Sequence, residues 1–454
     1  MEMEALLTQQ RAWFRTGATL GLTARKKGLE ALYQAVKNME GDIARALERD
    51  LGKAPCESYL CETGLVLHEI RYHLAHVKRW MSPSPGPVPW LHFPARSKIR
   101  PRPLGVSLII SPWNYPFHLC LMPLIGALSA GCCAVVKPSE YAPATAEVVE
   151  QVLKRALPQE QAAVVQGGRE ETEKLLEQPF DHIFFTGSQA VGKAVMAAAA
   201  KNLTPVTLEL GGKSPVILDH TADLKTAARR IAFGKVLNAG QTCVAPDYLL
   251  LEQGLQEKFL AHYRAALEDF FPGGNLSQMA RIVSRRHFAE KKALLAGQNA
   301  AIGGGWDEET GKISPTVLVD VDPASPVMQE EIFAPILPVI PWQTLDEAIA
   351  FVQERPRPLA LYLFTGDKAV ERRVLGACDF GGGCVNDTII HLASPGLPFG
   401  GVGPSGMGQY HGKYSFDAFS HPQAIVHRGN RPHIPVRDLP YTKEKERLAR
   451  WLLK

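Results

Sequence analysis

The sequence predicts an α/β protein with two α/β domains and one extended arm, and three observations lead to this fold class. From residue 104 onward, short apolar runs alternate with stretches of helical periodicity, as in a parallel sheet covered by helices on both faces. A second series of the same kind begins near residue 215. Before the first strands, the segment 82–103 is rich in proline. A length of 454 residues is typical of two or three domains with buried cores.

Residues 5–80 are predicted to be helical. Apolar side chains recur there every three or four positions, for example at Ile43, Leu47 and Leu51. The segment 82–103 then breaks this periodicity with seven prolines in 22 positions. We therefore expect an extended arm or linker at 82–103, outside any core.

Each predicted strand is a short, almost continuous apolar run, which is typical of strands buried on both faces. In the first domain the strands are expected at 106–110, 134–136, 163–165 and 182–185, with helices at 144–157 and 172–178. In the second domain they are expected at 215–219, 248–251, 335–340 and 361–364.

The segment 117–136 permits a second interpretation, because it is mostly apolar and long enough to cross a bilayer. It contains His118, Pro123 and Ser129, however, and Lys137 follows directly. A buried helix followed by a buried strand accounts better for these residues, so we expect no integral membrane segment.

Composition excludes several classes of protein. The 50 basic and 46 acidic residues nearly balance, which argues against nucleic acid as a partner. The eight cysteines form no CxxC pair, so we expect no metal site and no disulfide framework. The N-terminus lacks the apolar core of a signal peptide, and the C-terminus shows no lipidation motif. These features predict a cytoplasmic protein.

Cys243 is a candidate nucleophile. It follows Gly240-Gln241-Thr242 and stands shortly before Pro246, so its small and polar neighbours place it on a loop that can expose the thiol. Most free cysteines are instead small buried hydrophobes. The tetrapeptide alone leaves both interpretations open.

Glu209 is a candidate general base. It lies between Leu208 and Leu210 at the end of an apolar run, and Gly211-Gly212 follows. Partial burial would raise the pKa of this carboxyl group and suit it to proton transfer near neutrality. A structural salt bridge is the alternative interpretation.

Asn114 is a candidate hydrogen-bond donor. It lies in the loop Ser111-Pro112-Trp113-Asn114-Tyr115-Pro116, directly after the first predicted strand, and the two prolines stiffen this loop. A fixed amide there can stabilise an oxyanion. An ordinary turn asparagine would occupy the same kind of loop.

Two further segments suggest a bound nucleotide. The segment Gly187-Ser188-Gln189-Ala190-Val191-Gly192 follows a strand and opens a helix, a geometry that can hold a phosphate. Its glycine spacing is not the G-x-G-x-x-G fingerprint, which makes it a weak signal by itself. Lys137 and Glu140 follow another strand end and can hydrogen-bond ribose hydroxyls, although a surface turn would look the same.

Together, these segments resemble the aldehyde dehydrogenase superfamily over almost the whole chain. Three further segments resemble the class 3 branch of this superfamily: Gln-Glu-Glu-Ile-Phe at 329–333, Asn-Asp-Thr at 386–388 and Leu-Pro-Phe-Gly-Gly-Val-Gly at 397–403. The start of the chain, without the longer N-terminal segment of the tetrameric classes, is also similar. The resemblance implies an aldehyde dehydrogenase-like fold, with two Rossmann-like α/β domains on parallel sheets and an oligomerisation arm.

The domain organisation follows from the resemblance and the sequence patterns together. We expect an NAD(P)-binding domain, a catalytic domain with the nucleophilic cysteine, two arm segments, a loop region at the cofactor and substrate site, and a C-terminal tail. The expected boundaries are, in that order, 1–81 with 104–208, 209–390, 82–103 with 414–428, 391–413, and 429–454.

The resemblance also implies a role for each candidate residue. Cys243 matches the nucleophile, Glu209 the general base and Asn114 the oxyanion donor. The implied reaction is the oxidation of an aldehyde to a carboxylic acid through a thiohemiacetal and a thioester on Cys243, with water activated by Glu209.

Other positions match residues around the cofactor, which the resemblance implies to be NAD or NADP. These positions are Trp113, Lys137, Glu140, Gly187, Ser188, Gly192, Glu331 and Phe333. Ala334 departs from the family, which usually has glycine after that phenylalanine. A methyl group there can shift the Glu331 loop, which puts the preference between NAD and NADP in doubt.

Two other functions fit parts of the pattern. An acylating dehydrogenase would pass the acyl group to coenzyme A or phosphate, but a water-activating Glu209 argues against it. A non-catalytic relative would be expected to lack the nucleophile or the base, and both are present.

The class 3 resemblance also suggests a homodimer and medium- or long-chain aliphatic or aromatic aldehydes as substrates. The arm at 82–103 and the segment 414–428 are the expected dimer contacts. The tail 441–454 mixes basic and apolar residues. A helix packed on its own or a partner subunit and a helix lying on a membrane surface both fit this mixture.

Overall fold

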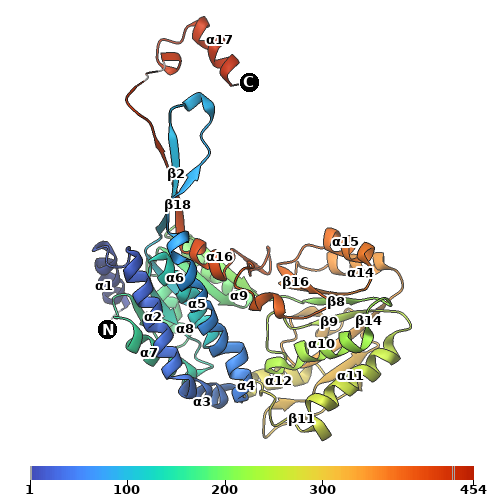
Figure 1. Ribbon diagram of the computed structural model, residues 1–454. Coiled ribbons are helices and arrows are strands. Elements are labelled where there is room, and N and C mark those ends of the chain that lie inside the picture. The colour runs from blue at the N-terminus through green and yellow to red at the C-terminus, as the bar shows by residue number, and fades with distance from the viewer. Residues whose placement is uncertain (1–2, 432, 434, 454) are drawn as a thin grey trace.

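The computed structural model describes residues 3–431, 433 and 435–453 (Figure 1). Residues 1 and 2 of the predicted cofactor domain, and residues 432, 434 and 454 of the predicted tail, lie outside the described residues. Two sheet-containing domains stand side by side, and an arm projects from the first of them. The expectation of two Rossmann-like α/β domains is confirmed.

The N-terminal region is helical, as its periodicity predicts. The chain begins with α1 (Met3–Arg15), α2 (Leu22–Asn38), α3 (Glu40–Leu51), α4 (Pro55–Ser58), the π-helical segment η1 (Tyr59–Thr63) and α5 (Gly64–Trp80). Helix α1 contacts strands of the first sheet, whereas α2, α3 and α5 pack against helices that follow those strands (Figure 1). A π-helical turn is rare and often stands at a functional site.

The first sheet has the strand order β17-β7-β6-β3-β4-β5. Its strands are β3 (Val106–Ile110), β4 (Cys133–Lys137), β5 (Ala162–Val164), β6 (His182–Gly187), β7 (Val206–Leu210) and β17 (Gly406–Met407). The helices that follow them are α6 (His118–Ala130), α7 (Pro143–Ala156), α8 (Arg169–Leu176) and α9 (Gln189–Ala200). All pairings are parallel except that of β17 with β7. The chain therefore changes its direction of progression across the sheet between β3 and β6, where such sheets bind ligands.

The second sheet has the order β10-β13-β14-β9-β8-β15-β16. Its strands are β8 (Pro215–Leu218), β9 (Tyr248–Glu252), β10 (Asn299–Ile302), β13 (Thr316–Val319), β14 (Ile336–Trp342), β15 (Ala360–Phe364) and β16 (Gly382–Val385). Its helices are α10 (Leu224–Val236), α11 (Gln256–Phe270), α12 (Arg285–Ala293), α13 (Pro326–Gln329), α14 (Leu345–Gln353) and α15 (Lys368–Ala377). A small hairpin of β11 (Trp306–Asp307) and β12 (Lys312–Ile313) lies beside it. Only β10 joins the sheet antiparallel, so both sheets are mostly parallel rather than wholly so.

The segment 117–136 forms the buried helix α6 and the start of the buried strand β4, as expected. Every residue of α6 is buried, which explains why its sequence is apolar on all sides. Among the described residues, no helix is both long and apolar enough to span a membrane.

The arm is a three-stranded antiparallel sheet of β1 (Ser84–Gly86), β2 (Arg96–Pro103) and β18 (Ser420–His427). Helix α17 (Lys443–Leu452) lies at its far end (Figure 1). Residues 414–418, which were expected in the arm, belong instead to α16 (Gly412–Ala418), which packs against α5 and α6. Apolar burial decides this difference, because Phe416 is 1% exposed within the main core.

The expected boundary between residues 208 and 209 falls within β7. The whole strand pairs with β6, so Glu209 belongs to the first sheet and not to the second domain. Similarly, β17 lies in the segment 391–413 and returns to pair with β7, where Gly406 is opposite Glu209.

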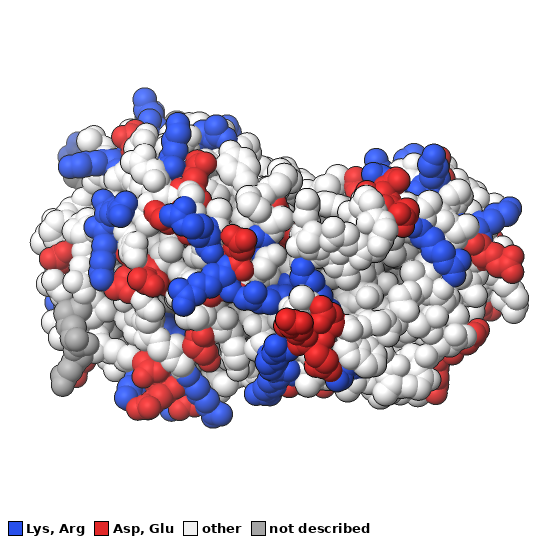
Figure 2. Space-filling model, turned by 90° about the horizontal axis from the view of Figure 1, so that it is seen from below, with Lys and Arg blue, Asp and Glu red and all other residues white. Residues whose placement is uncertain are grey.

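Charged side chains of both signs are interspersed over the face seen in Figure 2. The 50 basic and 46 acidic residues agree with this mixed surface. A face of this kind has no broad positive field that would attract a polyanion.

Candidate active site

A cleft of 910 Å³ contains most of the predicted site residues. Eight of them line it: Trp113, Asn114, Gly187, Ser188, Glu209, Cys243, Glu331 and Phe333. Lys137, Glu140 and Gly192 are not among the residues that line it. A volume of this size is typical of a site for a small molecule or cofactor.

Strand ends supply the first-domain wall of the cleft. Trp113 and Asn114 follow β3, and Gly187 and Ser188 stand at the end of β6. Because β3 and β6 are neighbours at the point where the strand order reverses, their loops diverge and leave a crevice. The adjacent strand β7 brings Glu209 to the same edge.

Cys243 follows α10 through a turn with three successive residues of positive φ. These are Asn238 (51°), Ala239 (53°) and Gly240 (72°). At Gly240 only glycine fits, since a Cβ atom would lie 2.4 Å from the backbone oxygen of Ala334. The turn is strained, and strain of this kind is typical of functional loops that their surroundings hold in place.

The Cys243 side chain is half-buried and lines the cleft, so the exposed-loop interpretation holds only in part. Burial raises the pKa of its thiol well above the usual value, and the charges of Glu209 and Glu331 raise it further. The thiol therefore retains its proton until a base removes it.

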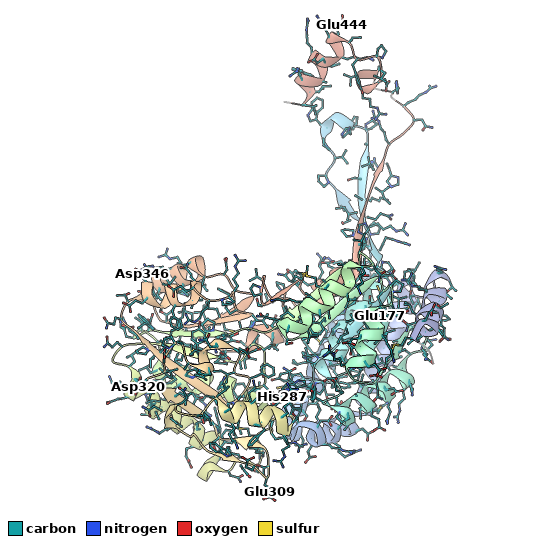
Figure 3. All side chains as sticks on the ribbon, turned by 180° about the vertical axis from the view of Figure 1, so that it is seen from behind. Glu177, His287, Glu309, Asp320, Asp346 and Glu444 are labelled. Atoms are coloured by element: carbon teal, nitrogen blue, oxygen red, sulfur yellow. The ribbon has the colours of Figure 1, made fainter. Side chains whose placement is uncertain are left out.

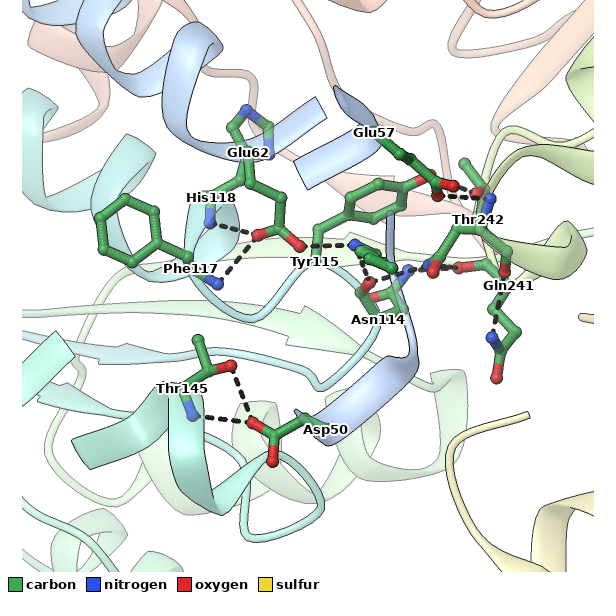
Figure 4. Close-up of polar contacts among 12 residues, drawn as sticks. Asp50, Glu57, Glu62, Asn114, Tyr115, Phe117, His118, Thr145, Gln241 and Thr242 are labelled. Carbon is green, nitrogen blue, oxygen red and sulfur yellow. Dashed lines mark hydrogen bonds and ion pairs between the residues drawn. The ribbon is translucent and has the colours of Figure 1, made fainter. Parts of the chain in front are cut away.

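Asn114 is 3% exposed and is held on both of its polar sides (Figure 4). Its side-chain amide donates a hydrogen bond of 3.0 Å to the backbone oxygen of Gln241. Its own backbone oxygen accepts from Asn238 Nδ2 at 2.8 Å. The amide has two N–H groups, and one of them suffices for Gln241. The other N–H is thus available to a ligand in the cleft.

Glu209 is 2% exposed, and neither of its carboxylate oxygens has a hydrogen bond of normal geometry to a described residue. Burial raises the pKa of this carboxyl group to about 8, and the nearby Tyr410 hydroxyl opposes the shift. No cation pairs with it among the described residues. The salt-bridge interpretation is therefore wrong, and the group is suited to exchanging protons near neutrality.

Glu331 is the second buried carboxyl group of the cleft. Burial raises its pKa to about 8, and the charge of Asp247 contributes. Its Oε2 lies so close to Gly211 that a Cβ atom there would be only 2.1 Å away, so a larger residue at 211 would displace the Glu331 carboxyl group. Its Oε1 has no partner among the described residues and is free to accept from a ligand hydroxyl.

Phe333 adopts a φ of 51° and packs edge-on against Trp113, with ring centroids 5.5 Å apart. Ala334 is fully buried in the core of the second domain. Its φ is not positive, so a methyl group is accommodated there without backbone strain.

The N-terminus of α9 faces the cleft and has the features of a phosphate site. Ser188 is its N-cap, and Gln189, Ala190 and Lys193 line the cleft. A Cβ atom at Gly192 would lie 2.7 Å from the Leu210 side chain, so glycine allows the helix to approach β7 closely. The free N–H groups of this helix, together with Lys193, fit a phosphate, and Glu331 fits a ribose hydroxyl.

Lys137 lies at the end of β4, where it is 2% exposed. Its ammonium group donates to the backbone oxygens of Pro138 (2.9 Å) and Gly167 (2.6 Å), which leaves one N–H for a ligand. Glu140 is exposed in the turn that follows.

Sequence patterns missed several residues that line the cleft. His287 lies where the two domains face each other (Figure 3), and its ring is 5.2 Å from that of Trp113. Lys213 forms a nearly buried ion pair with Asp247, whose other oxygen accepts from the backbone N–H of Ile332. A lysine directly after Gly-Gly was the available signal for Lys213, whereas nothing in the sequence around His287 indicated a site.

Comparisons with known proteins agree with this geometry. A sequence model described as the aldehyde dehydrogenase family matches residues 1–425. Aldehyde dehydrogenase family 3 member A2 of Mus musculus is 46% identical over 452 residues, which cover 99% of this chain and 93% of that protein. An aldehyde dehydrogenase of Rattus norvegicus described as dimeric and NADP-preferring is 45% identical, over 91% of this chain and 92% of that protein.

A solved structure has the same fold throughout. The substrate-bound state of Staphylococcus aureus AldH superposes with a TM-score of 0.98 at 44% sequence identity. The comparison covers 100% of both chains.

Proposed function

Because this chain belongs to the aldehyde dehydrogenase family, in its family 3 branch, and is an NAD(P)-dependent aldehyde dehydrogenase, we propose that Cys243, Asn114 and Glu209 perform its chemistry. The observation that supports these roles is their meeting in one cleft from three separate segments of the chain. A thiol, an amide donor and an unpaired carboxyl group are the groups that this reaction requires.

The first step is the transfer of the Cys243 proton. Glu209 is its acceptor, because the high pKa of this buried carboxyl group makes it a strong enough base for a thiol. The thiolate adds to the aldehyde carbon, and the carbonyl oxygen becomes an oxyanion. The free N–H of Asn114 and the backbone N–H of Cys243 stabilise that charge.

The second step forms and then hydrolyses a thioester. Collapse of the tetrahedral adduct expels a hydride and leaves the acyl group on Cys243. Bound NAD(P)⁺ supplies the hydride acceptor. Glu209 first releases the Cys243 proton to solvent and then takes a proton from water. The hydroxide adds to the thioester, the Cys243 sulfur leaves as a thiolate as the carboxylic acid forms, and the proton on Glu209 returns to that thiolate.

We assign the cofactor to the first domain and to the edge of the second. Ser188, Gly187 and Lys193 at the start of α9 hold the phosphates, and Gly192 lets this helix lie close to the sheet. Lys137 and Glu140 hold one ribose, Glu331 holds the other, and Trp113 and Phe333 line the space beside it.

The reaction is tested by NAD(P)H formation at 340 nm with a panel of aldehydes, without coenzyme A, for the wild type and Cys243→Ala. We expect medium- and long-chain aliphatic or aromatic aldehydes to react, and activity to vanish in the variant. Activity that requires coenzyme A would instead favour an acylating enzyme. Cofactor binding without any turnover would favour a non-catalytic relative.

We also propose that the protein is a homodimer that uses the arm. Trp90, at 67% exposed, and Trp451, at 68% exposed, contact each other. Trp451 belongs to α17, which lies at the far end of the arm, away from the two domains (Figure 1). Large aromatic side chains exposed in this way are typical of an interface. Sedimentation at micromolar concentration tests this proposal, and a monomer would contradict it.

A cytoplasmic location fits the thiols. All eight cysteines are free, and three of them, Cys120, Cys132 and Cys133, are fully buried. Free thiols persist in a reducing compartment. Fractionation of cells that produce the protein tests this assignment, and recovery with membranes would support the membrane-surface interpretation of α17.

A further inference from the structure

A buried ion pair holds the loop that carries Asn114. Lys53 and Glu62 are both fully buried, and the Lys53 ammonium group donates to Glu62 Oε1. The pair comes from the N-terminal helical region, where Lys53 follows the end of α3 and Glu62 lies in the π-helical segment η1. A charge pair buried this deeply is expensive to desolvate, so its other contacts indicate what it does.

Those contacts converge on the backbone of one loop. The Lys53 ammonium group also donates to the backbone oxygen of Asn114 at 2.9 Å. Glu62 Oε2 accepts from the backbone N–H groups of Phe117 (3.0 Å) and His118 (2.9 Å), as Figure 4 shows. The ion pair thus forms hydrogen bonds with the loop backbone on both sides of Tyr115.

The Tyr115 side chain is also held in place, by two contacts. The Lys53 ammonium group lies 4.0 Å from the centroid of its ring, a favourable cation–π contact. The Tyr115 hydroxyl is 2.6 Å from Thr242 Oγ1, next to the nucleophile. The buried cation therefore touches the two consecutive residues that link the loop to the Cys243 segment.

The Cys243 segment has a separate anchor. The backbone N–H of Asn238 donates to Glu57 at 2.9 Å, at the start of the strained turn. Gln241 donates through its side chain to the backbone oxygens of Asn238 and Arg281, both at 3.0 Å. The two Gln241 bonds do not involve Lys53, so its loss would leave this part of the anchoring in place.

We propose that Lys53, held by Glu62, is a positioning residue that fixes the Asn114 amide against the Cys243 segment for oxyanion stabilisation. The inference rests on the proposed function, because it acts through the role assigned to Asn114. Without the ammonium group, the Asn114 backbone oxygen keeps only Asn238 Nδ2 as a donor among the described residues. The loop then loses one of the bonds that fix its backbone at Asn114, which lets the amide move relative to the Cys243 segment.

The test compares hydride transfer in single-turnover measurements at 340 nm for Lys53→Met/Glu62→Gln and the wild type. Both charges are removed together, because removing one would leave the other buried and unpaired. Glutamine at 62 keeps an acceptor for Phe117 and His118. We expect hydride transfer to slow by about tenfold, less than for loss of the amide itself. The KM for cofactor should stay within about twofold, because a group that stabilises only the oxyanion changes the reaction rate and not cofactor binding.

A second measurement separates positioning from general damage. Alkylation of Cys243 by iodoacetamide needs the thiol but no oxyanion donor, so we expect its rate to stay within about twofold in the double variant. Asp50→Asn is the matched control, because Asp50 is a buried carboxylate nearby that holds Thr145 instead (Figure 4). This control should leave hydride transfer unchanged. A parallel fall in alkylation and hydride transfer would overturn the proposal.

The same substitutions in an Asn114→Ala background complete the test. If Lys53 acts through the amide, its removal should have less than about a twofold effect once the amide is absent. An undiminished tenfold effect in that background, or unchanged hydride transfer in the double variant itself, would overturn the positioning role. Failure of the proposed function itself would give a different result. In that case Asn114→Ala alone would leave hydride transfer unchanged.

Discussion

The two sides of the active-site cleft are held in opposite ways. On the donor side, Asn114 and the segment before Cys243 are fixed by four hydrogen bonds, two to each other, one to Lys53 and one to Glu57. On the base side, the Glu209 carboxylate has no hydrogen bond of normal geometry to any described residue. Stabilising an oxyanion depends on geometry, whereas accepting a proton depends on pKa. The difference shows how one cleft meets both demands: bonds fix the donor, and burial without bonds tunes the base.

The largest expected effect comes from removing the base of the cleft. Glu209→Gln removes the proton acceptor but keeps the shape, so thioester hydrolysis should slow by about 10²–10⁴. Acylation should slow as well, because Glu209 also accepts the Cys243 proton, but less than hydrolysis, since a thiol loses its proton to solvent far more readily than water does. Acyl-enzyme should therefore accumulate, visible as a burst of NAD(P)H followed by slow turnover and as a mass increase on Cys243. Glu331→Gln is the matched control, since Glu331 is the other buried carboxyl group with a pKa near 8. It should change cofactor affinity and produce no acyl-enzyme; unchanged turnover in Glu209→Gln would contradict the base assignment.

The next largest effect is expected from removing the oxyanion donor. Asn114→Ala should slow hydride transfer by about 10²–10³, the usual loss for one oxyanion donor. No burst should appear, because the step before thioester formation becomes limiting. Single-turnover rates at saturating aldehyde check this. A change in KM alone would mean that Asn114 only positions the substrate.

A smaller effect sharpens the comparison through pH. Glu209 acts as a base only when it is ionised, and burial raises its pKa to about 8. Hydrolysis of preformed acyl-enzyme should therefore rise about tenfold per pH unit below pH 8 and level off above it. Stopped-flow decay of the acyl-enzyme measures this profile. A profile that is flat between pH 6 and pH 8 would show that the carboxyl group is already ionised there.

The smallest effect concerns stability. The Glu209 pKa is about 8 in the folded protein and 4.5 in an unpaired carboxyl group, so the folded state binds this proton more tightly. Its contribution to stability is complete below pH 4.5 and is lost as the pH rises to 8. Glu209→Gln has no such loss, so relative to the wild type its free energy of unfolding should increase over this range, by on the order of 1–4 kcal/mol. Denaturant titrations at pH 5 and pH 8 measure the difference, and an equal difference at both values would contradict it.

Short sequence patterns were sufficient to predict the elements that depend on residues close together in the chain. The apolar run 106–110 is β3 without any shift, and the prolines of 82–103 do form part of an extended arm. The motifs around Cys243, Glu209 and Asn114 likewise named residues that share one cleft. Such features depend on side-chain type and spacing, which are visible in the sequence.

Pairings between distant segments were not visible. The antiparallel addition of β17 to β7 places Gly406 opposite Glu209, nearly 200 positions away in the chain. A two-residue strand has no periodicity of its own, so only the exposed edge of β7 defines it. The expected domain boundary at 208/209 missed this edge for the same reason.

The sequence by itself determined which side chains are available for chemistry, because a thiol, an amide and a carboxyl group next to turns are local facts. The tertiary structure alone decided their working properties. Burial from every side sets the pKa of Glu209, and a lysine at position 53 reaches Asn114 only because the chain after α3 lies beside the loop after β3. Proton affinity and precise placement depend on surroundings drawn from the whole chain, and no short stretch of residues contains them.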